Sequence, residues 1–264
     1  MKKFLLTLLA LTMVIAMVAC AKKDNTEDDD KSGDDKNREA ILSMATEGTF
    51  PPYEYYENNK LVGIDVEVAQ AIADKLDMEL EITDINFEAI IPGIQSKKYD
   101  IGMAGMTASE KRKEQVNFST SYSTGIQVII VKEGSPITSV DDLLSENANH
   151  IVGTQSGTTG FLYATDDIEK AGLGTVKSFA KTTDAVEALK NGQVDCVILD
   201  NEPAKKLVSV NTGLKILDTE YTVEEYAIAV AKDNTELLNK INTALDELIQ
   251  DGTVKKIVDK YITD

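Results

Sequence analysis

A stretch that occurs twice constrains the fold of this 264-residue chain more than any other feature. Ile94-Gln-Ser-Lys-Lys-Tyr-Asp100 and Leu189-Lys-Asn-Gly-Gln-Val-Asp195 share an aliphatic residue, a five-residue polar turn and an aspartate. Each follows a short helical pattern and precedes an apolar strand, at residues 101–105 and 196–200. Ligands of open α/β sheets bind beyond the carboxyl ends of strands, so these two strand ends are candidate sites. A coincidental local pattern with unrelated ends is the alternative.

The remainder of the chain alternates between strand and helix in the same way. Residues 40–45 and 78–82 have strand patterns, and residues 66–76 carry apolar side chains at helical spacing. With 42% hydrophobic residues, the chain can bury a sizeable core. The alternation predicts an α/β fold made of two α/β units.

Two long apolar runs, at residues 125–132 and 226–232, are suited to cross between the units as strands. If they do, the first lobe is built from both ends of the globular chain and the second lobe from its middle. We therefore expect a first lobe at residues 38–128 and 226–264, and a second lobe at residues 129–225 that includes the crossing strands.

The N-terminal segment has the pattern of a lipoprotein signal peptide. Two lysines precede an apolar run that ends at Met17-Val18-Ala19-Cys20, so residues 1–19 are expected to be removed and Cys20 to carry lipid. An uncleaved anchor helix is the alternative. Residues 20–37 are acidic and almost without apolar side chains, which predicts a disordered tether. The globular part would then be held outside the cytoplasm, at the membrane surface.

Charge and composition exclude several classes of protein. The formal net charge is −18, from 27 Lys+Arg and 45 Asp+Glu, which opposes binding to nucleic acid. His150 is the single histidine, so a histidine-based metal site or catalytic triad is not expected. Cys20 and Cys196 cannot build a disulfide scaffold. We expect no metal and no cofactor.

Polar and aromatic groups follow several predicted strands. Thr107-Ala-Ser-Glu110 has capping-box spacing for a helix that contains Arg112, a bidentate carboxylate binder. The polar loop at residues 153–160 offers hydroxyls and free N–H groups, and Asp200 ends a buried strand. Each has a purely structural interpretation: a surface helix, a loop, and a helix N-cap. The Phe-Pro-Pro-Tyr loop at residues 50–53 can be a packing corner or a rigid aromatic wall.

Together these groups suit a zwitterion. Arg112, a helix N-terminus and Thr159 can receive a carboxylate, whereas Asp200 and Glu47 can receive an ammonium group. Phe50 and Phe87 supply aromatic walls. The combination predicts an amino acid as the ligand.

From about Glu39 to the C-terminus, the chain resembles the amino-acid-binding proteins of bacterial ABC importers, the polar amino-acid family of periplasmic-type solute-binding proteins. Several separate stretches in the right order carry this resemblance. They are Glu47-Gly-Thr-Phe-Pro-Pro-Tyr-Glu-Tyr55, Val62-Gly-Ile-Asp-Val66, Phe87-Glu-Ala-Ile-Ile-Pro-Gly-Ile94, residues 100–107, Lys111-Arg112-Lys113, Val116-Asn-Phe-Ser119 with Tyr122, and residues 153–159.

The resemblance implies a two-lobed fold that closes on its ligand about a two-strand hinge. It implies that Arg112 binds the ligand α-carboxylate together with Thr107 and Thr159. Asp200 and the carbonyl of Gly105 would take the α-ammonium group. The remaining positions would surround the ligand side chain: Phe50 and Phe87 as its aromatic walls, Glu47 and Gln155 as the groups that select among amino acids.

The resemblance further implies a monomer that delivers a polar or basic L-amino acid to an ABC permease. Glu47 suits arginine, lysine, histidine or ornithine, but relatives that bind glutamine or cystine can also carry an acidic residue there. Two other functions remain open: a cyclohexadienyl-dehydratase-like enzyme on the same scaffold, and an amino-acid sensor or receptor module.

Overall fold

The computed structural model describes residues 40–263. The predicted signal peptide at residues 1–19, the tether at residues 20–37 and the lipid-bearing Cys20 lie outside the described residues. Residues 40–263 contain no helix that combines the length and the apolar character needed to cross a bilayer.

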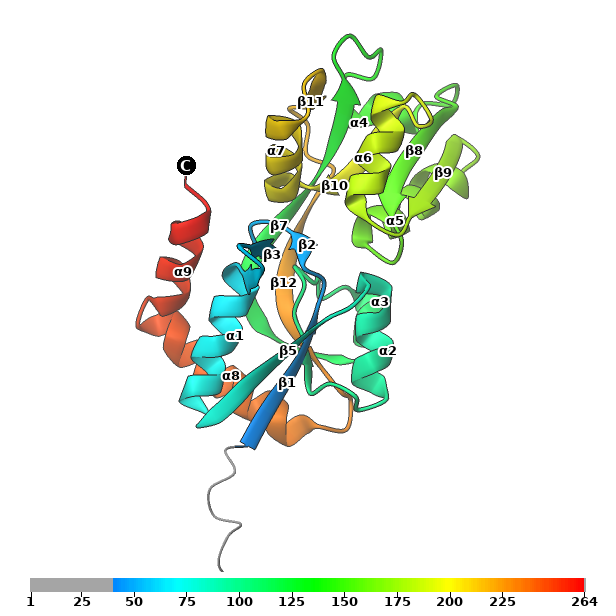
Figure 1. The fold of residues 1–264 in the computed structure, drawn as a ribbon. Helices are drawn as coiled ribbons and strands as arrows, with labels where there is room; N and C mark the ends of the chain where they lie inside the picture. Colours follow the sequence, from blue (N-terminus) through cyan, green and yellow to red (C-terminus); the bar gives the residue numbers. More distant parts are fainter. Residues whose placement is uncertain (1–39, 264) are drawn as a thin grey trace, which may run out of the picture. The chain divides into compact units, whose positions relative to one another are not determined.

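The described residues form a mixed α/β fold in which two groups of elements are joined by long strands (Figure 1). In the first lobe, β1 pairs in parallel with β5 and β6; in the second lobe, β8 pairs in parallel with β9 and β10. Strand β7 runs antiparallel to β12 and β10, so one sheet continues through both lobes in the order β5-β1-β6-β12-β7-β10-β8-β9. Its strands are β1 (Ala40–Thr46), β5 (Met78–Asp84), β6 (Ile101–Gly102), β7 (Asn117–Lys132), β8 (His150–Gln155), β9 (Gly174–Phe179), β10 (Cys196–Asp200), β11 (Leu214–Ile216), which pairs with β7, and β12 (Thr222–Val230).

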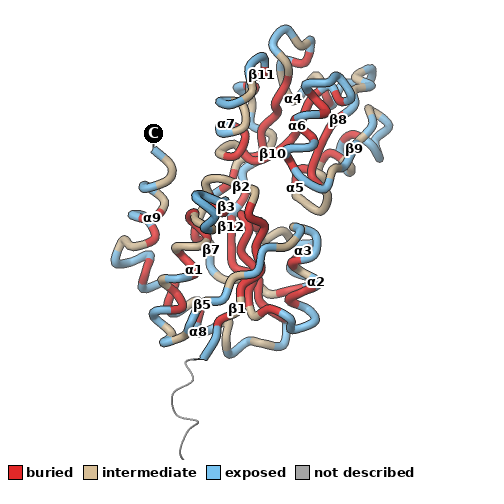
Figure 2. Tube along the Cα trace, viewed as in Figure 1, coloured by how far each residue is buried: buried red, intermediate tan, exposed pale blue. Residues whose placement is uncertain are grey.

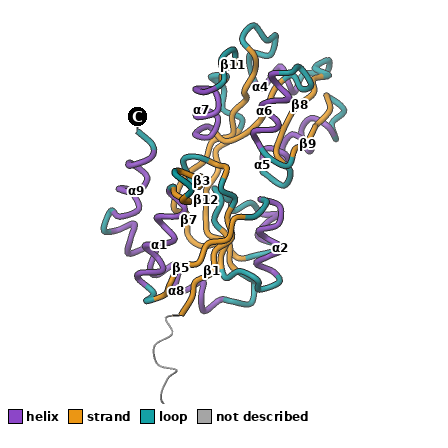
Figure 3. The backbone as a smooth tube through the Cα atoms, viewed as in Figure 1, coloured by secondary structure: helices purple, strands orange, loops and turns teal. Residues whose placement is uncertain are grey.

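Helices cover the strands of each lobe (Figure 3). The first lobe has α1 (Ile64–Lys75), a 3-10 turn (Phe87–Ala89) continued by α2 (Ile90–Gln95), α3 (Glu110–Lys113), α8 (Thr235–Gln250) and α9 (Thr253–Tyr261). The second lobe has α4 (Val140–Leu144), α5 (Thr159–Ala164) with a π-helical extension (Thr165–Glu169), α6 (Thr182–Lys190) and α7 (Asn201–Val210). A small sheet of β2 (Thr49–Phe50), β3 (Glu54–Glu57) and β4 (Lys60–Val62) belongs to the first lobe.

Buried residues concentrate along the central strands (Figure 2). Two apolar clusters flank the first-lobe strands, one containing Leu42 and Ile72, the other Ile90 and Met106. Two more flank β10 of the second lobe, through Val197 on one face and Ile198 on the other. Because these strands are buried on both faces, their sequences are continuous apolar runs and do not alternate between apolar and polar residues.

The repeated stretch folds in the same way in both lobes. Lys97 and Gly192 occupy equivalent turn positions, and both have a left-handed backbone with φ of 59° and 70°. Asp100 then accepts the backbone N–H of Ser43 on β1 at 2.9 Å, and Asp195 accepts that of Ile151 on β8 at 2.7 Å. Each aspartate therefore ties its own strand to the neighbouring parallel strand, which gives the repeat a structural role in both lobes.

Three sequence expectations differ from the structure. Ser109, not Thr107, caps the helix that contains Arg112, because Thr107 pairs with Tyr226 of β12 in an isolated β-bridge. A strand was expected at residues 101–105, but the observed strand ends at Gly102, and Gly105 has a left-handed backbone. The crossing strands are also displaced from their expected limits: β7 begins earlier than the apolar run, and β12 spans Thr222–Val230.

Candidate functional site

The nine predicted ligand-binding residues line one cavity between the lobes. Glu47, Phe50, Phe87, Gly105, Thr107 and Arg112 come from the first lobe, and Gln155, Thr159 and Asp200 from the second; Ala104 and Thr158 complete the lining. The cavity volume is about 20 Å³, close to what a single water molecule requires. An amino acid is much larger, so the lobes must separate to admit one.

Arg112 is a buried cation with unused hydrogen-bond donors. Arg112 is only 4% exposed. Its guanidinium donates from Nη1 to the carbonyl of Thr107 at 2.9 Å and from Nη2 to the carbonyl of Gly157, in the second lobe, at 3.0 Å. The guanidinium carbon lies 5.2 Å from the centroid of the Phe87 ring. Burial lowers the pKa of Arg112, and the nearby charges of Glu224 and Asp200 act against that shift. A guanidinium has five N–H donors, so Arg112 can also bind a carboxylate.

Asp200 lies at the carboxyl end of β10, in the opposite lobe. It is the residue before the first turn of α7, yet its side chain makes no capping hydrogen bond and instead accepts one from the hydroxyl of Tyr226. Burial raises the pKa of Asp200 to about 7, against the opposing effect of the Tyr226 hydrogen bond. A cationic group placed against this carboxylate would restore its ordinary, ionised form.

Gly105 follows strand β6 of the first lobe and lines the same cavity as Asp200. Its backbone has φ of +51°, and a Cβ there would come within 2.6 Å of the Phe50 ring. Its N–H donates to Asp65 at 2.9 Å, and burial raises the pKa of Asp65 to about 6. The left-handed backbone and the close approach of the aromatic ring both require glycine at this position.

Glu47 and Gln155 contact each other across the cavity. The Gln155 amide nitrogen donates to both Glu47 carboxylate oxygens, at 2.9 and 2.8 Å, while its amide oxygen accepts from the Thr182 hydroxyl at 2.7 Å. Burial raises the pKa of Glu47, an effect that the hydrogen bond from Gln155 and the charge of Lys181 oppose. Gln155 is thus oriented as a donor toward a buried carboxylate.

The aromatic residues have different neighbours. Phe50 stacks on Tyr53, with ring centroids 5.8 Å apart and an angle of 29° between the planes. Phe87 faces the Arg112 guanidinium. Both rings line the cavity, but one face of Phe87 also serves to hold the arginine.

Sequence reasoning missed two buried polar residues of the crossing strands, Gln127 and Glu224. One carboxylate oxygen of Glu224 accepts from the hydroxyls of Thr107 and Thr159, at 3.0 and 2.9 Å, and from the Gln127 amide at 3.0 Å. The expected strand began at Tyr226, two residues after Glu224. The signal was nevertheless present, because side chains alternate along a strand and the buried Tyr226 places Glu224 on the same face.

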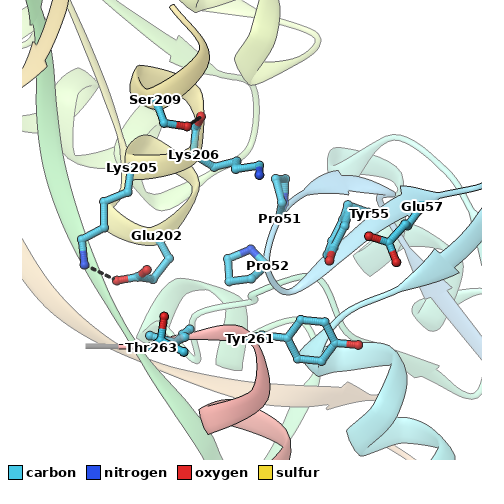
Figure 4. A pocket seen from close by; sticks show the side chains of 11 residues that line it. Pro51, Pro52, Tyr55, Glu57, Glu202, Lys205, Lys206, Ser209, Tyr261 and Thr263 are labelled. Atoms are coloured by element: carbon cyan, nitrogen blue, oxygen red, sulfur yellow. Dashed lines mark hydrogen bonds and ion pairs between the residues drawn. The ribbon is translucent and has the colours of Figure 1, made fainter.

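A larger and more open pocket lies away from these residues, between α7, the turn after β2, and the end of α9 (Figure 4). Its volume is about 390 Å³, and its wall includes Pro51, Tyr55 and Tyr261. None of the charged residues that line it is buried, and Lys205 pairs with Glu202 at 2.7 Å. The pocket does not combine buried groups of opposite charge, so the smaller cavity is the candidate ligand site.

Two arginine-binding proteins are similar to this chain in sequence over most of its length. An arginine-binding extracellular protein of Bacillus subtilis (strain 168) is 32% identical over 266 residues, which cover 100% of this chain and 99% of that protein. ABC transporter arginine-binding protein 1 of Escherichia coli (strain K12) is 32% identical over 226 residues, 83% of this chain and 90% of that protein.

Solved structures agree with these relatives. An ancestral arginine-binding protein bound to arginine is 42% identical, covers 84% of this chain and 98% of its own, and superposes with a TM-score of 0.78. The structure of an ancestral arginine-binding protein bound to glutamine gives the same identity and TM-score, over 86% of this chain and 100% of its own. The sequence model for bacterial extracellular solute-binding proteins, family 3, matches residues 42–264. The chain therefore belongs to family 3 of the bacterial extracellular solute-binding proteins.

Proposed function

We propose that the protein captures a basic L-amino acid, L-arginine foremost, between its two lobes and presents it to an ABC permease. One observation carries the proposal: the buried Arg112 and Asp200, of opposite charge and from opposite lobes, line the same cavity as the buried Glu47. Arg112 and Asp200 match the two charges of any α-amino acid. Glu47 is then left to receive a positive side chain.

In this mechanism the ligand joins the lobes. Arg112 and the backbone N–H groups of Thr107 and Thr159 bind the α-carboxylate, while Asp200 binds the α-ammonium group, so both lobes contact the ligand only when they are closed. Phe50 and Phe87 enclose the side chain, and Glu47 with Gln155 selects it. The lobes would be residues 38–128 and 226–264 on one side and residues 129–225 on the other. Ligand shifts the population toward the closed form, which the permease recognises.

We further propose that the protein is a monomer, held outside the cytoplasm by a lipid on Cys20.

The relatives are named as binding proteins, and the site supports binding without turnover, because its two charged receivers match both ends of an intact amino acid. Prephenate and arogenate are the substrates that would reveal a dehydratase. We expect neither to be consumed by the protein.

The direct test is a thermal-melt series of the full chain with L-arginine, L-lysine, L-ornithine, L-histidine, L-glutamine and L-cystine. A ligand at a thousand times its dissociation constant adds about 4 kcal/mol to the free energy of unfolding. We expect the largest increase in Tm with L-arginine. A larger increase with glutamine or cystine would make Glu47 a hydrogen-bond acceptor for a neutral side chain, and no increase with any of them would refute amino-acid binding.

A further inference from the structure

Glu224 is a buried carboxylate on β12, one of the strands that cross between the lobes. Its neighbours alternate: Val223 is 61% exposed and Glu225 is exposed, whereas Glu224 is 4% exposed and Tyr226 is fully buried. Burying a carboxylate is unfavourable unless donors satisfy it. The position therefore demands specific partners on the inner face of the strand.

Those partners come from three different parts of the fold. Thr107 precedes α3 in the first lobe, Thr159 is the first residue of α5 in the second lobe, and Gln127 lies on β7. All three donate to the same oxygen of Glu224, Oε2, at distances of 2.9 to 3.0 Å. The Arg112 guanidinium provides a positive charge nearby. A single side chain thus contacts both lobes and the strand that runs between them.

The donor capacity of a hydroxyl limits what these two threonines can bind. Each threonine hydroxyl has one proton to donate, so a proton given to Glu224 is not given to another acceptor at the same time. Hydrogen bonds to a charged acceptor are stronger than bonds between neutral groups. The two threonines, one from each lobe, are therefore held to β12 by protein contacts alone.

We propose that Glu224 is a positioning residue for lobe closure: its carboxylate ties Thr107 of the first lobe and Thr159 of the second lobe to strand β12, and so stabilises the closed arrangement without help from a ligand. The proposal rests on the proposed function in one respect, that closure is the step that follows amino-acid binding. In addition, Glu224 biases the equilibrium between open and closed lobes before any amino acid binds.

Hydrogen exchange of the full chain, followed by mass spectrometry without ligand, measures this bias. Glu224→Ala should raise exchange by about tenfold in the cleft segments at residues 105–112 and 155–164, since it removes the hydrogen bonds that hold Thr107 and Thr159 to β12. Exchange in α6 and α8, which lie outside the cavity, should not change. Glu225→Ala is the matched control, because it removes the same charge from the exposed neighbour and should leave every segment unchanged.

Unchanged exchange in the two cleft segments of Glu224→Ala would overturn the proposal, and so would an equal rise in α6 and α8, which would indicate general destabilisation. If Glu224→Ala does not fold, Glu224→Gln keeps the size of the side chain and should raise exchange in the same segments by a smaller factor. L-Arginine is then added to the wild-type chain. If L-arginine does not protect the cleft segments of the wild type from exchange, that result counts against the proposed function. The ligand-free comparison still decides the role of Glu224.

Discussion

Arg112 and Lys113 are neighbours with the same charge and different surroundings. Arg112 is buried and contacts the cavity, whereas the Lys113 side chain is 49% exposed and pairs with Glu110. Arg112→Lys retains the charge but loses the planar pair of donors that matches a carboxylate. We expect it to weaken L-arginine binding about a hundredfold in isothermal titration calorimetry. Lys113→Ala should bind as the wild type does, and equal losses in both variants would remove Arg112 from the site.

Asp200 makes the stability of the ligand-free protein depend on pH. Its pKa is about 7 in the folded chain against an ordinary value of 3.8, so the folded form binds the proton more tightly than the unfolded chain does. The resulting stabilisation is complete below about pH 4 and is lost as the pH rises through 7. Asp65, with a pKa of about 6, acts in the same direction. Tm without ligand should therefore be higher at pH 5 than at pH 8.

The ligand should reverse part of that trend, because an ammonium group binds the ionised form of Asp200. We expect the increase in Tm caused by L-arginine to grow from pH 5 to pH 8. Asp200→Asn, which cannot ionise, should show a weaker pH dependence of the ligand-free Tm and little response to L-arginine at either pH. If L-arginine raises the Tm of the wild type by the same amount at pH 5 and pH 8, the assignment of Asp200 as the ammonium receiver is contradicted.

At the scale of elements, the paired strands β7 and β12 leave no room for a side chain at Gly125. A Cβ there would overlap the hydroxyl and ring of Tyr226, the residue that donates to Asp200. Gly125→Ala should lower the free energy of unfolding by about 2 kcal/mol in urea denaturation, because the ring must move. Thr124→Ala, at the exposed position beside it, should change the free energy by less than about 0.5 kcal/mol. Equal effects would mean that Tyr226 can be displaced at little cost.

At the scale of the whole molecule, the formal net charge of −18 favours the approach of a cation over that of a neutral amino acid. The association rate of L-arginine should fall several-fold between about 0.01 and 0.15 M ionic strength, as the Debye length shortens from about 30 to 8 Å. L-Glutamine, with no net charge, is the control and should show almost no change. Stopped-flow tyrosine fluorescence can follow both, and equal salt dependence would show that long-range charge has no part in capture.

The sequence predicted the elements whose patterns are local. Strand β1, helix α1 and the repeated stretch follow from periodicity and turn residues, because each pattern is complete within a dozen residues. The capping role expected for Thr107 was wrong, since pairing with Tyr226, more than a hundred residues away, competes with the local motif. A single sequence carries no direct record of such a partner.

By itself, the sequence determined the fold class and named nine residues that the structure brings to one cavity, because strand ends, charge types and family motifs are written along the chain. Only the tertiary structure decided that Glu224 joins Thr107 to Thr159, that Gln155 faces Glu47, and that Tyr226 rather than a helix end binds Asp200. Those contacts join segments far apart in the chain. Their energies depend on which donors packing brings within reach of a buried carboxylate, and that is fixed only when both lobes fold around the crossing strands.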